Sequence, residues 1–403
     1  MTIRHPHFVP DSRLRSRTPV RRRRGGQLGL LALLAAAAVA TPAFAEFDES
    51  YRFDANSLSV SSLIGKVEIS RAAGDEFEVE VSVRGEDGTR QNIRLDEDMR
   101  GSRARLAIEF PVDEERRYVY PEFSRRRANL WSRRQGSADS LLGEILRSMS
   151  GRRIRIERSG SGFEAWADVS IRVPEGRSLK VELGAGDIDV SDVTADLELK
   201  TRAGMAEAAG LDGDVKIGVG SGGLTVRDVR GRLVLDTGSG KASLDGFKGA
   251  MLSIDTGSGS VEVTDVAAEA IDIDTGSGGV TVDGLEAERF SIDTGSGSVR
   301  VESAGADAAV IDTGSGRVHL ALQRMGDGRF EIDTGSGGIV FLVPDDLSAR
   351  FDIDIGSGGI DVDVPIAKTL HKSRGEMRFI AGDGEANVIL DTGSGSVRVA
   401  SVD

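Results

Sequence analysis

A five-residue string, Asp-Thr-Gly-Ser-Gly, recurs along the second half of the chain and constrains its fold more than any other feature. Its first five copies stand 19 residues apart, and a variant, Asp-Ile-Gly-Ser-Gly, occurs once. The aspartates that begin these strings are Asp236, Asp255, Asp274, Asp293, Asp312, Asp333, Asp354 and Asp391. A fixed period near 20 residues is typical of a solenoid, in which every repeat forms one rung that stacks on its neighbours.

One repeat, residues 273–290, shows what each rung contains. Its apolar residues are Ile273, Val280, Val282, Leu285 and Phe290, and polar residues alternate with most of them. This is the period of a half-buried strand, and no run has the 3.6-residue spacing of a helix. One such unit cannot bury its apolar face alone, whereas parallel stacking can. The sequence therefore predicts an all-β, single-stranded β-solenoid (β-helix-like) of about 10–13 rungs.

Stacking in register predicts columns of equivalent residues. One interior column comprises Leu235, Ile254, Ile273, Ile292, Ile311, Ile332 and Ile353, and another comprises Val226, Leu244, Val263, Val282, Val301 and Leu320. Strand alternation then points each aspartate outward and the following threonine inward. We expect the eight aspartates to form a structural turn ladder, not a catalytic site, with carboxylates that accept hydrogen bonds from the turn amides. A row of bound Ca²⁺ ions is the alternative, and no other cofactor is expected.

Enzyme signatures in the chain have structural explanations. Asp-Thr-Gly-Ser is the aspartic protease string, but that enzyme needs two carboxylates sharing one proton, and this chain has eight candidates at a structural period. Lys241 follows a glycine-rich turn but lacks the spacing of a phosphate-binding loop. A carbohydrate-active lyase or hydrolase on a β-helix remains the alternative, and His371, Asp345 and Asp346, where the repeat is interrupted, are its candidate residues. The prediction is that the chain is not an enzyme.

The N-terminal 45 residues have the pattern of an export signal. A run of arginines precedes the apolar stretch "LGLLALLAAAAVA", and "TPAFA" offers a cleavage site after Ala45. Cleavage would remove eight Arg and one Asp, so the net charge would change from −14 to −21. No later stretch is long and apolar enough to predict a membrane span. The chain also has no cysteine, which excludes disulfides and thiolate metal sites.

Composition divides the remaining chain into three parts. Residues 46–111 alternate as strands and are expected to begin the solenoid, and residues 161–403 form its repeats. Residues 112–160 hold twelve Arg against seven acids, and we expect an inserted, partly disordered loop with a short helix over 139–149. This insert offers a contact patch for anionic groups: Arg125, Arg126, Arg127, Trp131, Arg133 and Arg134.

Three stretches carry a resemblance to a known family. They are "LIGKVEISRAAGDEFEVEVSVRG", "VSIRVPEGRSLKVELGAGDIDVSDV" and the repeated "IDTGSGSVEVTDV". Over residues 46–111 and 165–403 the chain resembles the bacterial putative-adhesin family of unknown function, which is built from short β-strand repeats. The resemblance implies an exported, repetitive all-β envelope or surface domain. It implies no catalytic residues, and the arginine-rich insert lies outside it.

The sequence thus predicts an exported, non-enzymatic, adhesin-like binding or structural protein of the periplasm, cell envelope or cell surface, with a repetitive acidic face. The expected partner is an envelope or surface ligand, a protein or a glycan. Nucleic acid is not expected, because residues 181–403 hold 39 acids against 19 bases. End-to-end self-association is open, because a solenoid ends in unpaired strand edges. An envelope-stress sensing or regulatory module is a further alternative.

Overall fold

The structure is a computed structural model that describes residues 46–131 and 153–402, and the described residues contain strands and no helix. The export signal, the helix expected over 139–149, Arg133 and Arg134 therefore lie outside the described residues. Within residues 46–131 and 153–402 no helix is long and apolar enough to cross a membrane.

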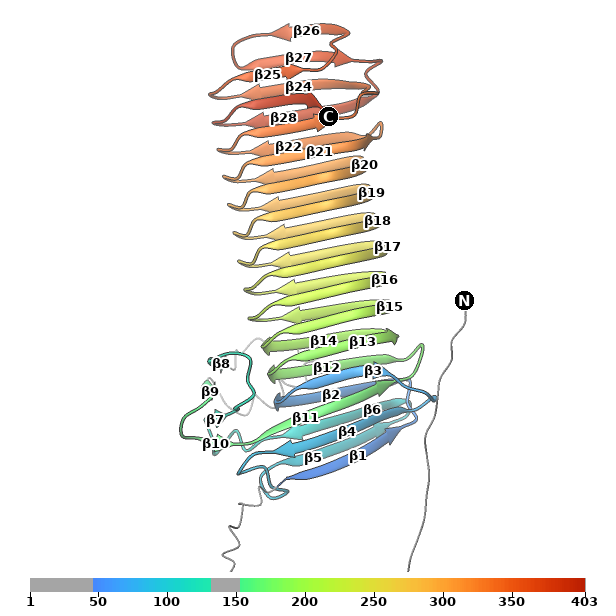
Figure 1. The fold of residues 1–403 in the computed structure, drawn as a ribbon, viewed down its shortest axis with the longest axis vertical. Coiled ribbons are helices and arrows are strands. Elements are labelled where there is room, and N and C mark those ends of the chain that lie inside the picture. The colour runs from blue at the N-terminus through green and yellow to red at the C-terminus, as the bar shows by residue number, and fades with distance from the viewer. Residues whose placement is uncertain (1–45, 132–152, 403) are drawn as a thin grey trace, which may run out of the picture. The chain divides into compact units, whose positions relative to one another are not determined.

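Parallel rungs make up most of the fold (Figure 1). The strands of successive rungs pair in register. For example, Val280 to Thr294 of one rung pair with Val299 to Thr313 of the next. The strands of this stack are β12 (Ser178–Ala185), β13 (Ile188–Thr194), β14 (Asp196–Ala203), β15 (Ala206–Val219), β16 (Leu224–Thr237), β17 (Ala242–Thr256), β18 (Val261–Thr275), β19 (Val280–Thr294), β20 (Val299–Thr313), β21 (Val318–Met325), β22 (Arg329–Thr334) and β23 (Ile339–Val343). This arrangement confirms the β-solenoid that the repeat predicts.

Alternate residues of each rung are apolar and fill the interior of the solenoid. Val263, Val282 and Val301 are paired in register and are almost fully buried, as the predicted column requires. Burying each such side chain stabilises the fold by roughly 1.5–3 kcal/mol. Since neighbouring rungs supply most of the covering atoms, the stability of each rung depends on the next, and the two ends need special closure.

The N-terminal end mixes parallel and antiparallel pairs. β2 (Ser57–Ile64) and β3 (Val67–Arg71) lie in the stack and pair in parallel with β12 and β13. β4 (Phe77–Arg84) pairs antiparallel with β1 (Phe47–Phe53) and β11 (Trp166–Val173), and β5 (Arg94–Arg100) pairs antiparallel with β6 (Arg103–Glu109). Residues 46–111 thus contribute one parallel rung and several end strands.

The C-terminal end departs from chain order. β28 (Ala386–Thr392) and β29 (Val397–Ser401) lie between the rung of β22 and β23 and the rung of β24 (Ala349–Ile355) and β25 (Ile360–Asp363). The prediction that Ile332 and Ile353 are direct neighbours in the interior column is therefore wrong, because Leu390 lies between them and pairs with both. The hairpin of β26 (Lys368–Lys372) and β27 (Glu376–Ala381) closes the end antiparallel to β24.

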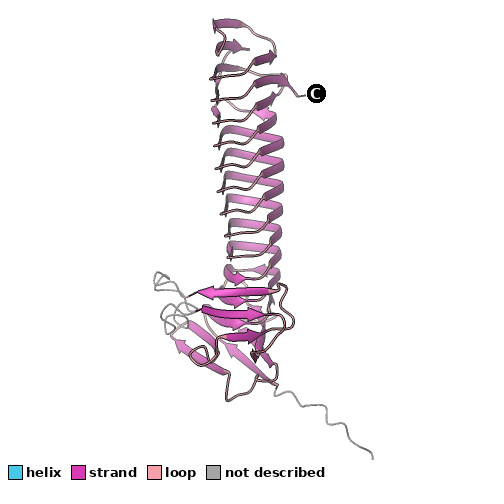
Figure 2. Ribbon diagram, turned by 90° about the vertical axis from the view of Figure 1, so that its left-hand side faces the viewer, coloured by secondary structure: helices cyan, strands magenta, loops and turns pink. Residues whose placement is uncertain are grey.

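The described part of the insert differs from the expected irregular loop. β7 (Arg117–Val119), β8 (Arg127–Trp131), β9 (Arg153–Glu157) and β10 (Phe163–Glu164) form a separate four-stranded sheet, which we call the small sheet. Its inner face buries Ile154, Ile156 and Leu130 in the same core as the solenoid. The alternation of arginine and isoleucine in "RIRIE" indicates a strand of this sheet. The high arginine content of the insert led to the prediction of a loop instead. Figure 2 shows the strands of the described residues and the loops and turns that join them.

Candidate binding surfaces

The eight repeated aspartates form one unbroken column, which we call the Asp ridge. Each pairs in register with the next, in the order Asp236, Asp255, Asp274, Asp293, Asp312, Asp333, Asp391 and Asp354. All eight are exposed, while the preceding apolar residue and the following threonine or isoleucine are buried. Strand alternation therefore continues to the turn, as the sequence analysis expected.

The ridge is an array of uncompensated negative charge. Among the described residues, no ion pair or hydrogen bond reaches any of the eight carboxylates. Partial burial, and then the charges of Asp236 and Asp274, raise the pKa of Asp255 above its usual value. Burial, Asp312 and Asp274 do the same to the pKa of Asp293. The column therefore repels itself and favours a cationic partner.

In the central strings the threonine, not the aspartate, satisfies the turn. Thr294 Oγ1 accepts a hydrogen bond from the Gly297 N–H at 3.0 Å and donates one to the Gly278 carbonyl of the preceding rung at 3.1 Å. Thr313 repeats both bonds one rung later. The expectation that the carboxylates cap the turn amides was therefore wrong in its choice of residue. The buried hydroxyl joins two turns, and the carboxylate is left free for contact.

The second glycine of the string is required by close stacking. A Cβ added at Gly278 would lie 1.6 Å from the Gly259 carbonyl oxygen, and one added at Gly297 would lie 1.7 Å from that of Gly278. Positive φ applies at Gly240 and Gly358 but not at these central turns. The turns therefore bring their backbones together in a way that no other residue permits, which holds the aspartates at the rung spacing.

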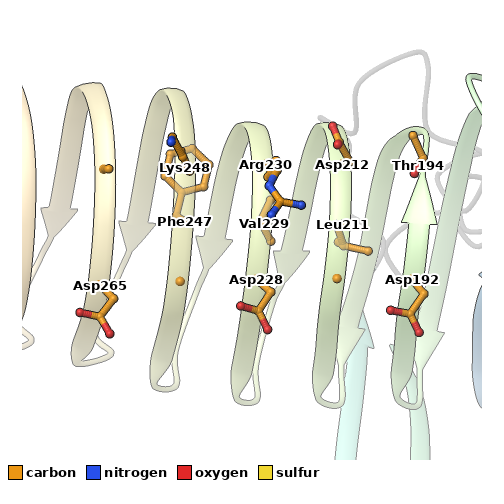
Figure 3. Close-up of a pocket in the computed structure, with 13 residues that line it drawn as sticks. Asp192, Thr194, Leu211, Asp212, Asp228, Val229, Arg230, Phe247, Lys248 and Asp265 are labelled. Atoms are coloured by element: carbon orange, nitrogen blue, oxygen red, sulfur yellow. The ribbon is translucent and has the colours of Figure 1, made fainter.

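A second corner of the solenoid contains aspartate on alternate rungs (Figure 3). Asp192, Asp228 and Asp265 each adopt positive φ, as does Ser303 further along. Glycine occupies the same corner on the intervening rungs, at Gly210, Gly246 and Gly284. A Cβ added at Gly284 would lie 2.7 Å from Asp265 Oδ1, so each carboxylate takes the space beside the next glycine. This corner was not predicted from the sequence, although the spacing of Asp and Gly before a buried Val, Leu or Phe indicates it.

This corner borders an open groove of about 600 Å³. Its floor is apolar, with Leu211, Val229 and Phe247, and its opposite wall carries Arg230 and Lys248 (Figure 3). Both signs of charge therefore face the groove.

The outward face of the small sheet carries the opposite charge to the Asp ridge. We call this the arginine face: Arg117, Arg127, Arg153 and Arg155, which alternate with buried residues on their strands. Arg127 Nε lies 2.8 Å from a carboxylate oxygen of Glu157, and Arg155 Nε lies 3.9 Å from the same atom. The ring centroids of Tyr120 and Trp166 lie 5.7 Å apart, and this contact packs the small sheet against β11. The face is suited to carboxylate or phosphate groups.

The predicted contact patch is only partly assembled. Arg127 lies on the arginine face, and Trp131 ends the same strand, with Arg153 as its Cα partner. Arg125 is half-buried and Arg126 is exposed in the segment before β8, so neither belongs to the sheet face. The structure adds Arg117, Arg153 and Arg155, which alternation with Tyr118, Ile154 and Ile156 could have indicated.

The candidate enzyme residues do not converge. His371 pairs across β27 with Arg378, whereas Asp345 and Asp346 precede β24, whose first residue pairs with Ala381. His371 Nε2 instead lies 3.6 Å from Glu376 Oε2. Within the described residues, no group of three or more His, Asp or Glu side chains is arranged to hold a metal ion.

The chain matches a family model and is similar to solved structures. The model of the family described as Toastrack DUF4097 matches residues 154–400, more than half of the chain. A putative cell adhesion protein from Clostridium sporogenes ATCC 15579 is 10% identical, with a TM-score of 0.16, and the match covers 89% of this chain and 100% of that one. A putative adhesin from Bacteroides fragilis NCTC 9343 is 10% identical, with a TM-score of 0.29 and coverage of 88% and 96%. At these scores neither structure supports an inference about this chain. No curated protein matches it.

Proposed function

The chain belongs to the Toastrack DUF4097 family, as the resemblance of its repeats indicates, and from this premise we propose that it is an exported, non-enzymatic binding or structural protein of the cell envelope or surface. Its contact surface is the Asp ridge. The observation that carries this proposal is the in-register stack of eight exposed carboxylates without a compensating cation among the described residues.

The physical argument is one of repeated geometry. Rungs of a β-stack lie ~4.8 Å apart, so the ridge offers a carboxylate at each step along its length. One surface carboxylate contributes little to binding, because exposed ion pairs are worth about 0–1 kcal/mol. Several engaged together by one cationic partner add their contributions without further loss of its freedom. A ridge of this kind favours a repetitive, positively charged ligand.

Export is tested by the compartment in which the full chain is found and by its N-terminal residue after processing. A C-terminally tagged full chain, expressed in a bacterium, should appear outside the cytoplasm with Glu46 as its first residue. Protein that stays in the cytoplasm with Met1 or residues 2–45 intact would end the export part of the proposal. The expectation rests on the signal pattern of residues 1–45.

The ridge is tested with a cationic probe. Purified residues 46–403 should bind an immobilised oligolysine peptide, and the quadruple variant D255N/D274N/D293N/D312N should bind it at least about tenfold more weakly. The matched control removes four exposed acids elsewhere, D245N/E269Q/D283N/E288Q, and so makes the same change in net charge. Equal weakening in both variants would mean that net charge, and not the ridge, attracts the probe.

A further inference from the structure

The arginine face holds two like charges side by side. Arg117 of β7 and Arg155 of β9 are direct partners in parallel strands of the small sheet. Like charges directly opposite each other destabilise a sheet. Glu157 is the carboxylate nearest to this pair, but it contacts Arg127 closely and Arg155 only at 3.9 Å. Among the described residues Arg117 has no ion-pair partner, so its positive charge beside Arg155 is not balanced.

The chain itself carries the complementary surface. Residues 112–160 hold twelve Arg against seven acids, whereas residues 181–403 hold 39 acids against 19 bases. Neighbouring strands of any sheet lie ~4.8 Å apart, so Arg117 and Arg155 repeat at the same interval as aspartates on consecutive rungs of the ridge. Two guanidinium groups can therefore meet two carboxylates without adjusting either backbone, and planar guanidinium groups pair well with carboxylates.

We propose that the arginine face of one copy docks on the Asp ridge of a second copy. Each contact would relieve like-charge repulsion on both surfaces. The two surfaces are different, so the contact is heterologous, and each copy keeps one free arginine face or one free ridge for another copy. The inference rests on the proposed function in one respect, that the ridge is a contact surface.

Ionic strength determines where the association is measurable. Two mature chains of net charge −21 repel each other at long range. At about 0.1 M salt the screening length is about 10 Å, which removes much of this repulsion but leaves ion pairs in contact. At about 1 M salt the screening length is about 3 Å, and the ion pairs weaken too. Association should therefore be present at the lower salt and lost at the higher one.

The test is sedimentation velocity of residues 46–403 between about 1 µM and about 1 mM, the range of a weak contact. The mean mass of the unaltered chain should rise with concentration at about 0.1 M NaCl. The variants R117E/R155E and D274K/D293K should each stay monomeric, with association weakened about tenfold or more. Their equimolar mixture should associate, because each variant keeps one unaltered surface and the two exchanged surfaces are also of opposite charge.

A matched control and a charge exchange complete the experiment. The variant R289E/R350E makes the same charge change at exposed arginines outside the arginine face and should associate as the unaltered chain does. Combining R117E/R155E with D274K/D293K in one chain restores opposite charges and should restore association. Far-ultraviolet circular dichroism of each variant separates loss of contact from loss of fold.

Three results would overturn the inference. The first is an unaltered chain that stays monomeric at both salt concentrations; if it still binds oligolysine through the ridge, the proposed function stands while this inference fails. The second is association that survives R117E/R155E. The third is a monomeric chain that floats with phosphatidylglycerol vesicles through the same arginines, which would make anionic lipid the partner. If the chain associates but does not bind oligolysine, this inference stands, and the ridge is not a general cation-binding surface.

Discussion

Two corners of each rung repeat along the solenoid under different rules. At the corner of the Asp-Thr-Gly-Ser-Gly string, the same residues follow one another on consecutive rungs. At the other corner, aspartate and glycine alternate from Asp192 to Gly284. The first corner can repeat because its buried threonine bonds to the turns of both rungs. The second alternates because a carboxylate occupies the space beside the next rung and only glycine leaves it free.

The two corners therefore differ in which side chains are structural and which are available for contact. At the first corner, threonine and glycine do the structural work, so the aspartate faces solvent with no bond to hold it. At the second corner, the aspartate itself determines what its neighbour must be.

The largest effect is expected for Gly278→Ala at the first corner. The new Cβ would lie 1.6 Å from the Gly259 carbonyl oxygen, and backbone on two rungs would have to move. We expect a loss of about 3–5 kcal/mol of unfolding free energy, measured by urea denaturation. Gly279→Ala is the matched control, because its Cβ would meet only Ser298 oxygen at 3.5 Å, an ordinary contact. Similar losses in the two variants would contradict the close-stacking explanation.

A smaller effect is expected for Thr294→Val at the same corner. The change keeps the shape but removes the hydroxyl that joins Gly297 and Gly278, and leaves a buried N–H and a carbonyl unsatisfied. The expected cost is about 1–3 kcal/mol. Thr281→Val, on the exposed side of the same rung, should change stability by less than about 0.5 kcal/mol. Faster amide hydrogen exchange at Gly297 in the first variant alone would locate the loss.

A smaller loss of stability is expected for Gly284→Ala at the second corner, and its size should depend on Asp265. Gly284→Ala forces a Cβ into a backbone of φ +70° and places it 2.7 Å from Asp265 Oδ1, the end of a side chain that can turn aside. We expect a cost of about 1–2 kcal/mol. In the background of Asp265→Gly the same change should cost less, because the carboxylate is gone. An undiminished cost in the double variant would show that the alternation has another cause.

The smallest effect concerns pH. The pKa values of Asp255, Asp293, Asp333 and Asp391 are raised in the folded chain, so protonation favours the folded state. Their unfavourable contribution is complete at neutral pH and is relieved as pH falls through the raised folded pKa values toward the unfolded value of about 3.9. The variant D255N/D293N/D333N/D391N should lack this part of the pH dependence of thermal melting. If the unaltered chain and the variant show the same pH profile, the ridge carries no such repulsion.

Much of this molecule followed from its sequence, because period and alternation are local properties. The 19-residue spacing predicted the parallel β-solenoid, and alternation around the string predicted that Ile292 and Thr294 point inward and Asp293 outward. The interior column through Val263, Val282 and Val301 was correct for the same reason. These features require only that identical units stack in register.

Three features were decided by tertiary structure alone. Any rung with this string can stack on any other, so the sequence could not show that Leu390 lies between Ile332 and Ile353. Several groups compete for the same turn amide, so only the packed turn shows that Thr294, and not Asp293, bonds to it. Arginines far apart in the chain meet on one face only because β7 and β9 pair across the insert, since strand pairing is a long-range choice.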